Sequence, residues 1–255
     1  MTSPIIPTIT RNISSQELSK VLEAKENKFE LFYFNLNTHG ATSSALLAYD
    51  DAEWKMIHSD DWFGEDKPLT KFGTLPILYE NSADDKHVVE IAEALNIELY
   101  LAHKFNLLGD NIFEESQILG YYSNSRALMH RQEDAYFTRS QFRKEEYDKF
   151  VDEKLKQCIR THEKALKENG NNGTLCRQQD IKTAVAIDQL LNKLYVFKGY
   201  EDVTELINKE VTHNLWKVRE TVLEKKSYRK WLDSEEFKAT AAETQSYFDI
   251  EYNQL

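Results

Sequence analysis

One side chain of this sequence, Tyr33, is well suited to chemistry on a thiol. It lies in the stretch FELFYFNLNTHG (29–40), where an apolar run gives way to polar residues and a glycine. A phenol with a pKa of ~10 is a poor base at neutral pH but a good hydrogen-bond donor. A phenol that donates to a sulfur stabilises the thiolate, which is the nucleophilic form. Most strand tyrosines have the ring in the core and the hydroxyl in water, so Tyr33 taken alone indicates no role on a thiol.

The pair Leu75-Pro76, about forty residues later, is the second candidate. Proline has no N–H, so within the strand-like segment GTLPILYE it indicates an edge or a bend. An ordinary edge-strand proline is one interpretation. A cis peptide bond that turns the N–H and C=O of Leu75 toward the peptide bond of a ligand is the other.

The sequence lacks the motifs of other kinds of reactive site. The seven histidines are scattered, and no two lie four residues apart, so we expect no metal site. The two cysteines, Cys158 and Cys176, form no CxxC pair, which fits neither a zinc cluster nor a disulfide framework but fits a reducing compartment. Phosphate-binding loops of the GxxxxGK[ST] or GxGxxG type do not occur.

Composition narrows the range of partners. The chain has 255 residues, 41% hydrophobic and 29% charged, with only 8 Gly and 4 Pro, which is typical of a well-ordered, helix-rich protein. Its formal charge is −11, so it repels phosphate backbones, and we expect no nucleic-acid partner. No run approaches the ~18 to 20 apolar residues of a membrane span, and no secretory signal is recognisable. We therefore expect a cytoplasmic protein without a membrane partner.

The elements that must position Tyr33 and Pro76 form a small α/β unit. Strand patterns are predicted over 29–36, 54–59 and 73–80, and helical periodicity over 41–52 and 88–109. A segment of 28 residues precedes this unit and carries a capping box, Ser14 with Glu17, that predicts a short helix.

The rest of the chain is predicted to be all-helical. Long segments with a 3.6-residue period follow from Phe113, interrupted by the NGNNGT loop at 169–174, and only YVFKG (195–199) has a strand-like pattern. The expected fold class is α/β plus all-α. The expected domains are an N-terminal extension (1–28), an α/β domain (29–109) and an all-helical domain (112–255).

The order and spacing of these features resemble those of the cytosolic glutathione S-transferases, in particular the tyrosine-type, sigma-like members. LFYFNLNTHGATSSALLAY is similar to the opening of those proteins, and DDWFGEDKPLTKFGTLPILYE to their W…K…FG-x-[LI]-P-x-L segment. LYLAHKFNLLG resembles the end of their first domain, and HNLWKVRETVLEKKSYRKWLDS their C-terminal part. The resemblance extends over about residues 29 to 235.

The resemblance implies a fold and a site. Residues 29–109 would form a thioredoxin-like, glutathione-binding domain, followed by the helical domain. Tyr33 falls on the catalytic tyrosine that donates to the glutathione sulfur. Trp62 and Lys67 fall on residues that contact the glycine end. Leu75, before the cis-Pro76, falls on the residue whose backbone pairs with the cysteinyl part.

Several positions depart from the family pattern. The [EQ]-[ST] pair that holds the γ-glutamyl carboxylate at a helix N-terminus reads Glu93-Ala94, so its hydroxyl is missing. The arginine that often supports the tyrosine falls on His39. The loop after the third strand is also about six residues longer than usual, and the extension 1–28 is additional.

Two hypotheses follow. In the first, the chain is a detoxifying glutathione transferase: it uses glutathione as co-substrate, binds no metal, joins the thiolate to a hydrophobic electrophile and forms a homodimer. In the second, it is a non-catalytic protein of the same fold with a structural, storage or interaction role. Tyr33 and Leu75-Pro76 favour the first, whereas Ala94, His39, the longer loop and the extension favour the second.

Overall fold

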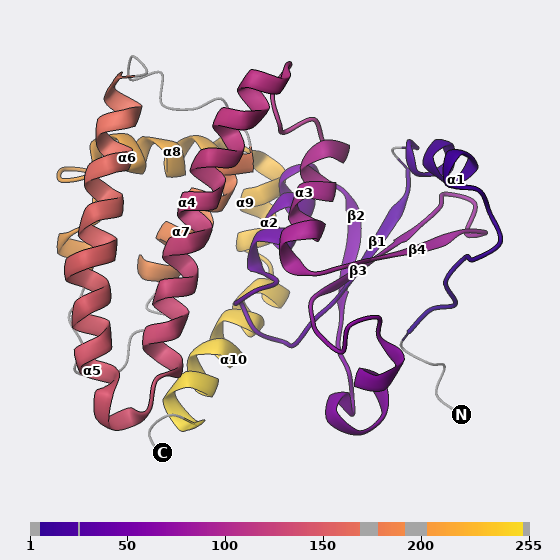
Figure 1. Cartoon of the computed structure of the whole chain (residues 1–255), viewed down its shortest axis with the longest axis horizontal. Coiled ribbons are helices and arrows are strands. Elements are labelled where there is room, and N and C mark those ends of the chain that lie inside the picture. Colours follow the sequence, from indigo (N-terminus) through magenta and orange to yellow (C-terminus); the bar gives the residue numbers. More distant parts are fainter. Residues whose placement is uncertain (1–5, 25, 169–177, 192–202, 252–255) are drawn as a thin grey trace. The chain divides into compact units, whose positions relative to one another are not determined.

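The computed structural model describes residues 6–24, 26–168, 178–191 and 203–251, and these form two compact units (Figure 1). Unit 1 is Met1–Asn106 and unit 2 is Leu107–Leu255. Unit 1 contains a sheet with helices, and unit 2 contains helices alone in its described part. None of the described helices is both long enough and apolar enough to cross a membrane.

Unit 1 is built on a four-stranded mixed sheet of order β2-β1-β3-β4. β1 pairs in parallel with β2 and antiparallel with β3, which pairs antiparallel with β4. The predicted α/β arrangement, thioredoxin-like and followed by helices, is confirmed. In chain order its elements are α1 (Ser15–Leu22), β1 (Lys28–Phe32), α2 (Ala41–Tyr49), β2 (Glu53–Ile57), the short η1 (Trp62–Asp66) and η2 (Lys67–Leu69), β3 (Ile77–Asn81), β4 (Val88–Ala92) and α3 (Ala94–Lys104).

The prediction of one continuous helix from Val88 onward was wrong. Val88–Ala92 is strand β4, and α3 begins only at Ala94. The segment VVEIA carries β-branched residues that alternate, burying Val89 and Ile91. A hairpin connection joins it to β3, with the N–H of Ser82 donating to the carbonyl of His87 at 2.8 Å. Pairing with β3 therefore makes Val88–Ala92 a strand, although the residues that follow it form a helix.

The two faces of the sheet have different covers. Alternation places Leu31, Leu78 and Glu80 on the face that α3 contacts. The opposite face has a buried cluster of Phe32, Trp62, Ile77, Tyr79 and Ala92. Two residues of the N-terminal segment, Ile6 and Ile9, pack against this cluster.

The N-terminal segment is part of unit 1. The N–H of Thr10 donates to the carbonyl of Val88 at 2.9 Å, and its hydroxyl accepts from the N–H of Val88 at 2.9 Å. This pairing holds the N-terminal segment against the outer edge of β4. The predicted capping box opens α1, with the hydroxyl of Ser14 accepting from the N–H of Glu17 at 3.2 Å.

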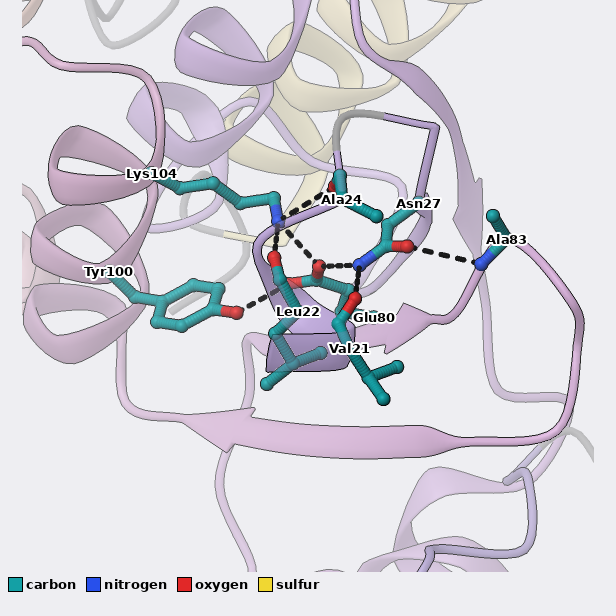
Figure 2. A network of polar contacts seen from close by, with 8 residues as sticks. All are labelled: Val21, Leu22, Ala24, Asn27, Glu80, Ala83, Tyr100 and Lys104. Atoms are coloured by element: carbon teal, nitrogen blue, oxygen red, sulfur yellow. Dashed lines mark hydrogen bonds and ion pairs between the residues drawn. The ribbon is translucent and has the colours of Figure 1, made fainter. Parts of the chain in front are cut away.

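A buried polar network fixes this segment to β3 and α3 (Figure 2). Its centre is the carboxylate of Glu80, whose residue is fully buried. Nζ of Lys104 lies 2.7 Å from Oε1 of Glu80, and Nδ2 of Asn27 lies 2.6 Å from the same oxygen. The hydroxyl of Tyr100 donates to Oε2 at 2.5 Å. Both carboxylate oxygens are thus satisfied.

The same network binds the end of α1. Lys104 donates to the carbonyls of Leu22 and Ala24, and Asn27 donates to the carbonyl of Val21 at 3.2 Å. A cation at a helix C-terminus stabilises the partial negative charge of the terminal carbonyls. Figure 2 shows these carbonyls directed at the two side chains.

The regular elements in the described part of unit 2 are all helices, as predicted. Its core contains Tyr147, Phe150 and Val151 together with residues of the later helices. The strand-like YVFKG and the loop 169–174 lie outside the described residues. The elements are α4 (Ile112–Phe137), α5 (Ser140–Lys149), η3 (Phe150–Leu155), α6 (Lys156–Glu168), α7 (Gln178–Leu191), η4 (Val203–Glu205), α8 (His213–Glu224), α9 (Lys226–Leu232) and α10 (Glu235–Glu251).

Candidate functional site

The sheet brings three of the predicted site segments to one edge. Phe32, Ile77 and Ala92 form one register row across β1, β3 and β4. The next residue outward in each strand is therefore Tyr33, Pro76 and Glu93, respectively. Neighbouring strands lie ~4.8 Å apart, so the backbones at 33 and 93 are separated by roughly 10 Å with Pro76 between them.

The hydroxyl of Tyr33 has two partners in the loop that follows β1. The hydroxyl oxygen lies 2.5 Å from Oγ1 of Thr38, with either atom able to donate, and it accepts from the N–H of His39 at 3.1 Å. The Tyr33 side chain is buried, with 3% of its surface exposed. His39 thus supports the phenol through its backbone, whereas the resemblance implied a supporting side chain at this position.

Gly40 lets this loop close on the tyrosine ring. A Cβ at position 40 would lie 2.7 Å from Cδ1 of Tyr33, well inside van der Waals contact. The glycine also stands at the N-cap of α2, whose first residue is Ala41. The close approach of backbone to ring holds the phenol in one position at the end of β1.

Trp62 and Lys67 occupy different surroundings. The ring of Trp62 is 8% exposed and meets Phe32 and Phe34 edge-on at 6.0 Å each, so it packs in the core. Nζ of Lys67 lies 6.0 Å from the centre of the Phe63 ring. The Lys67 stem lies about 3.5 Å from where a Cβ of Gly73 would stand. Lys67 therefore lies beside the loop that leads to Leu75.

That loop is held by its own hydrogen bonds. The hydroxyl of Thr70 donates to the carbonyl of Lys67 at 2.9 Å and accepts from the N–H of Gly73 at 3.1 Å. Gly73 has a φ of 65°, which favours glycine. The peptide bond between Leu75 and Pro76 is cis, which agrees with the second of the two interpretations of this pair given above.

Glu93 has a strained backbone at the start of α3. Its φ of 75° and ψ of 122° are unusual for a residue with a side chain, and such conformations cost about 1–3 kcal/mol and recur at functional sites. Its side chain does not cap α3. Instead Oε1 of Glu93 accepts from the hydroxyl of Thr74 at 2.9 Å.

The N-terminus of α3 is open on this side. Ala94, the first helical residue, has no hydroxyl, and the first turn has no acidic side chain. A hollow of about 340 Å³ borders the turn, lined by Lys71, Phe72, Glu90, Ile91, Ala92, Glu93, Asn96 and Tyr100. Backbone N–H groups, two carboxylates and a lysine therefore lie within one small region.

Sequence reasoning missed three residues of this edge: Thr38, His58 and Thr74. The hydroxyls of Thr38 and Thr74 bind Tyr33 and Glu93, and Nδ1 of His58 lies 2.8 Å from the carbonyl of Tyr33. His58 follows β2 directly, and Ile57 pairs with Phe32, so the strand register could have indicated this neighbour. The threonines carry no pattern that a single sequence reveals.

The longer loop lies far from Tyr33. Asn81 and Val88, which flank it, pair at the opposite end of the sheet, in the same row as Lys28. The loop residues bond among themselves, for example Ser82 Oγ to Asp84 at 2.7 Å. The loop therefore neither covers nor borders the edge that carries Tyr33.

The thiol of Cys158, in unit 2, is poorly suited to act as a nucleophile. Burial raises the pKa of this thiol to about 11, so it stays protonated at neutral pH. Cys176 lies outside the described residues.

No protein-family model and no curated protein matches this sequence. Solved structures do match. The sigma-class GST of Fasciola hepatica has a TM-score of 0.66 at 16% identity, over 81% of this chain and 95% of that one. Prostaglandin synthase D of Nilaparvata lugens has a TM-score of 0.65 at 18% identity, over 82% of this chain and 98% of that one.

A Pi-class glutathione S-transferase of Onchocerca volvulus matches with a TM-score of 0.63 at 20% identity, over 84% of this chain and 95% of the other. The likeness extends over nearly the whole length of each of these proteins. The chain therefore has the glutathione S-transferase fold, which confirms the fold indicated by the sequence resemblance.

Proposed function

We propose that unit 1 binds glutathione across the sheet edge of Tyr33, Pro76 and Glu93, and that the chain is a glutathione transferase. The observation that carries this proposal is the register row: it gathers these three positions, distant in sequence, onto one edge. The span of roughly 10 Å between the outer two positions is about the length of an extended tripeptide.

Each part of glutathione has a suitable partner along this edge. The thiol would lie at the hydroxyl of Tyr33, and the cysteinyl peptide groups at the backbone of Leu75. The γ-glutamyl ammonium would meet the carboxylate of Glu93, which Thr74 orients. The γ-glutamyl carboxylate would accept hydrogen bonds from the open first turn of α3, where the helix dipole favours an anion.

The glycine end has weaker support. Lys67 beside Gly73 can reach a carboxylate near Leu75, and a lysine cation suits that role. Trp62 packs in the core, so its proposed contribution is to hold the surrounding loop in place while Lys67 supplies the charge.

The chemistry needs a hydrogen-bond donor. If the hydroxyl of Thr38 and the N–H of His39 both donate to the phenol oxygen, they make the phenol more acidic and its own proton a stronger donor to a thiolate. The thiol loses its proton to water, and the thiolate attacks an electrophilic carbon. The S–C bond forms while the leaving group departs with the electrons of the bond that breaks, so no covalent enzyme intermediate arises.

The second candidate is a protein of this fold that does not catalyse conjugation. The 2.5 Å contact between Tyr33 and Thr38 favours it, since a phenol that donates to Thr38 serves only to tie the loop 34–40 to β1. Ala94 favours it too, because the γ-glutamyl carboxylate then lacks a hydroxyl donor.

Titration calorimetry with glutathione and a conjugation assay with chlorodinitrobenzene, on wild type and Tyr33→Phe, test the proposal. We expect binding at millimolar glutathione or below, and a loss of about 10²–10³ in kcat for Tyr33→Phe, the cost of one donor to a reacting anion. Tyr247→Phe, the same chemical change in unit 2, serves as control. Absence of glutathione binding overturns the whole proposal. Binding without conjugation supports the second candidate.

We also propose a homodimer that acts in the cytoplasm on hydrophobic electrophiles, in a detoxifying role. Large apolar side chains are exposed on each unit, and where such side chains gather into a patch they are typical of protein interfaces. They include Phe63, Leu69 and Phe72 in unit 1 and Ile112 and Phe113 in unit 2. Sedimentation velocity should give twice the chain mass, and a monomer would contradict the dimer.

A further inference from the structure

The outer face of the sheet in unit 1, opposite α3, is covered largely by irregular chain. The apolar residues that gather on this face come from the strands, from η1 and from segments without regular structure. In the described part of the chain, none of them comes from a helix longer than η1. The apolar face of a sheet has to be buried against another part of the protein, so these irregular segments supply the cover that a helix often gives.

Two residues of the N-terminal segment, Ile6 and Ile9, belong to this cover. They lie three residues apart with Pro7 between them, and in an extended, polyproline-like chain every third side chain points to the same side. Burial follows this period, because Ile6 and Ile9 are half-buried while Thr8 is exposed. One side of the segment therefore faces the sheet and the other faces solvent.

The chain that follows Ile9 anchors the segment. Thr10 makes two hydrogen bonds of 2.9 Å with Val88, one through its N–H and one through its hydroxyl. Further along, Lys104 binds the carbonyls at the end of α1. Figure 1 shows the indigo trace of this segment running from α1 along the side of the sheet. Because position 10 is fixed at β4, the residues just before it are kept at the edge of the outer face.

Ile6 and Ile9 pack on the residues that support the proposed glutathione site. Trp62 belongs to the buried cluster of the outer face and begins η1, which leads to Lys67. Leu75, whose backbone is proposed to pair with the cysteinyl part of glutathione, also packs against this cluster. The two isoleucines and both ends of the proposed binding segment therefore share one apolar cluster.

That binding segment, residues 60–76, depends on apolar contact for its attachment to the sheet. Its hydrogen bonds are largely internal, such as that from the hydroxyl of Thr70 to the carbonyl of Lys67 at 2.9 Å. Internal bonds give the segment its shape but do not hold it against β1 and β3. Protein interiors have few voids, so packed side chains transmit a displacement to their neighbours. A gap beside Trp62 should therefore loosen the whole segment.

The phenol of Tyr33 is less exposed to such a change. Phe34 links it to the cluster, since its ring lies 6.0 Å from that of Trp62 and 5.7 Å from that of Tyr33. The hydroxyl of Tyr33, however, is held by the loop that follows β1. Loss of the isoleucine side chains should therefore affect glutathione binding more than the chemical step.

We propose that residues 6–10 position the segment 60–76 for glutathione. Ile6 and Ile9 are the positioning residues, and they act through the apolar cluster of the outer face. This inference rests on the proposed function, because it concerns the same site. It gives the N-terminal segment, which precedes the part of the chain that resembles the transferases, a role in binding.

The test compares the full-length chain with Ile6→Ala/Ile9→Ala. Hydrogen exchange of the backbone amides, followed by mass spectrometry, examines the segment 60–76 without any ligand, and we expect exchange there to be at least about fivefold faster in the variant. Glutathione affinity, measured by calorimetry, should fall by about fivefold, because a ligand binds only the fraction of molecules with an ordered site. In the conjugation assay, the KM for glutathione should rise while kcat stays within about twofold.

Two matched variants serve as controls. Leu18→Ala removes the same number of carbon atoms from α1, which has no residue packed on the cluster. It should leave the exchange of the segment 60–76 and the glutathione affinity unchanged. Ile6→Leu/Ile9→Leu keeps the apolar volume and should behave like wild type. Thermal unfolding establishes that each variant folds.

Unchanged exchange of the segment 60–76 in Ile6→Ala/Ile9→Ala overturns the inference, as does an equal acceleration in Leu18→Ala. A fall in kcat with unchanged glutathione affinity overturns it as well. If the wild-type chain binds no glutathione, it is the proposed function that fails, and the exchange rates alone then decide whether residues 6–10 hold the segment in place.

Discussion

The two ends of the sheet in unit 1 both gather polar groups, yet they use them differently. At the end of Lys28, Asn81 and Val88, the buried Glu80 has all of its partners within the chain. At the other end, Glu93 and the first turn of α3 face a hollow, and the helix N-terminus has no side-chain cap. The protein closes one end with its own groups, and the other end is the proposed glutathione site.

This difference shows how to separate structural polar groups from functional ones on a single sheet. A buried charge is tolerated when every acceptor and donor is satisfied, because leaving one unpaired is costly. Glu93 has a strained backbone at an uncapped helix start, and its bond with Thr74 satisfies one carboxylate oxygen without relieving that strain. Its cost is consistent with a role in binding.

The largest expected effect is at the closed end. Lys104→Met leaves the carboxylate of Glu80 without its cation, which should lower the free energy of unfolding by about 3–5 kcal/mol in urea denaturation. Lys55→Met is the matched control, because its pair with Glu30 is also 2.7 Å long but Lys55 is exposed, so the pair should contribute below about 1 kcal/mol. Equal losses in the two variants would refute the contrast.

The second effect is at the open end. Ala94→Thr restores a hydroxyl at the start of α3 and should strengthen glutathione binding by about tenfold or more, the size of a charge-assisted hydrogen bond. Ala94→Val has nearly the same shape without the hydroxyl and should not. Calorimetry measures both, and equal affinities would mean that the γ-glutamyl carboxylate lies elsewhere.

Alkaline pH should weaken the closed end. Burial, followed by the charge of Glu80, raises the pKa of Tyr100 in the folded chain. Above about pH 10 the unfolded phenol loses its proton while the folded one keeps it, so stability falls by at most about 1.4 kcal/mol per pH unit. Urea unfolding at about pH 9 and about pH 11 gives this slope. Tyr100→Phe should reduce it, and an unchanged slope would exclude Tyr100 as its source.

The smallest effect concerns the hydroxyl beside Tyr33. If Thr38 donates to the phenol, as the proposed mechanism requires, Thr38→Val should lower kcat by about fivefold, the value of one neutral hydrogen bond, whereas Thr38→Ser should retain activity. The absorbance of the bound thiolate against pH should give a higher thiol pKa in Thr38→Val. A faster Thr38→Val would show that Thr38 competes with the thiol for the phenolic proton.

Much of the fold could be predicted from periodicity and capping. The capping box of Ser14 and Glu17 correctly predicted the start of α1. The 3.6-residue spacing of apolar residues correctly predicted the helices in the described part of unit 2. Strand β4 was missed because VVEIA runs directly into the helical EALNIELYLA. Only its pairing with β3, a non-local interaction, distinguishes the two.

The site was harder to predict than the fold. Tyr33 and Pro76 could be singled out because a phenol and a strand proline are conspicuous residue types. Thr38 and Thr74 belong to the site because their hydroxyls contact Tyr33 and Glu93, respectively. These contacts depend on loop geometry and not on local sequence. Trp62 was predicted from the resemblance to contact a ligand, and that assignment stays a prediction for a ring that is packed in the core.

The bonds of Lys104 to the end of α1 have a consequence for folding during synthesis. They join positions 82 residues apart, and Thr10 reaches Val88 across 78 residues. Chains emerge from the ribosome N-terminus first, and contacts between distant residues form late because long loops must close. The segment with α1, which is made before α3, must therefore wait for α3 before it can dock, and it is among the last parts of unit 1 to become fixed.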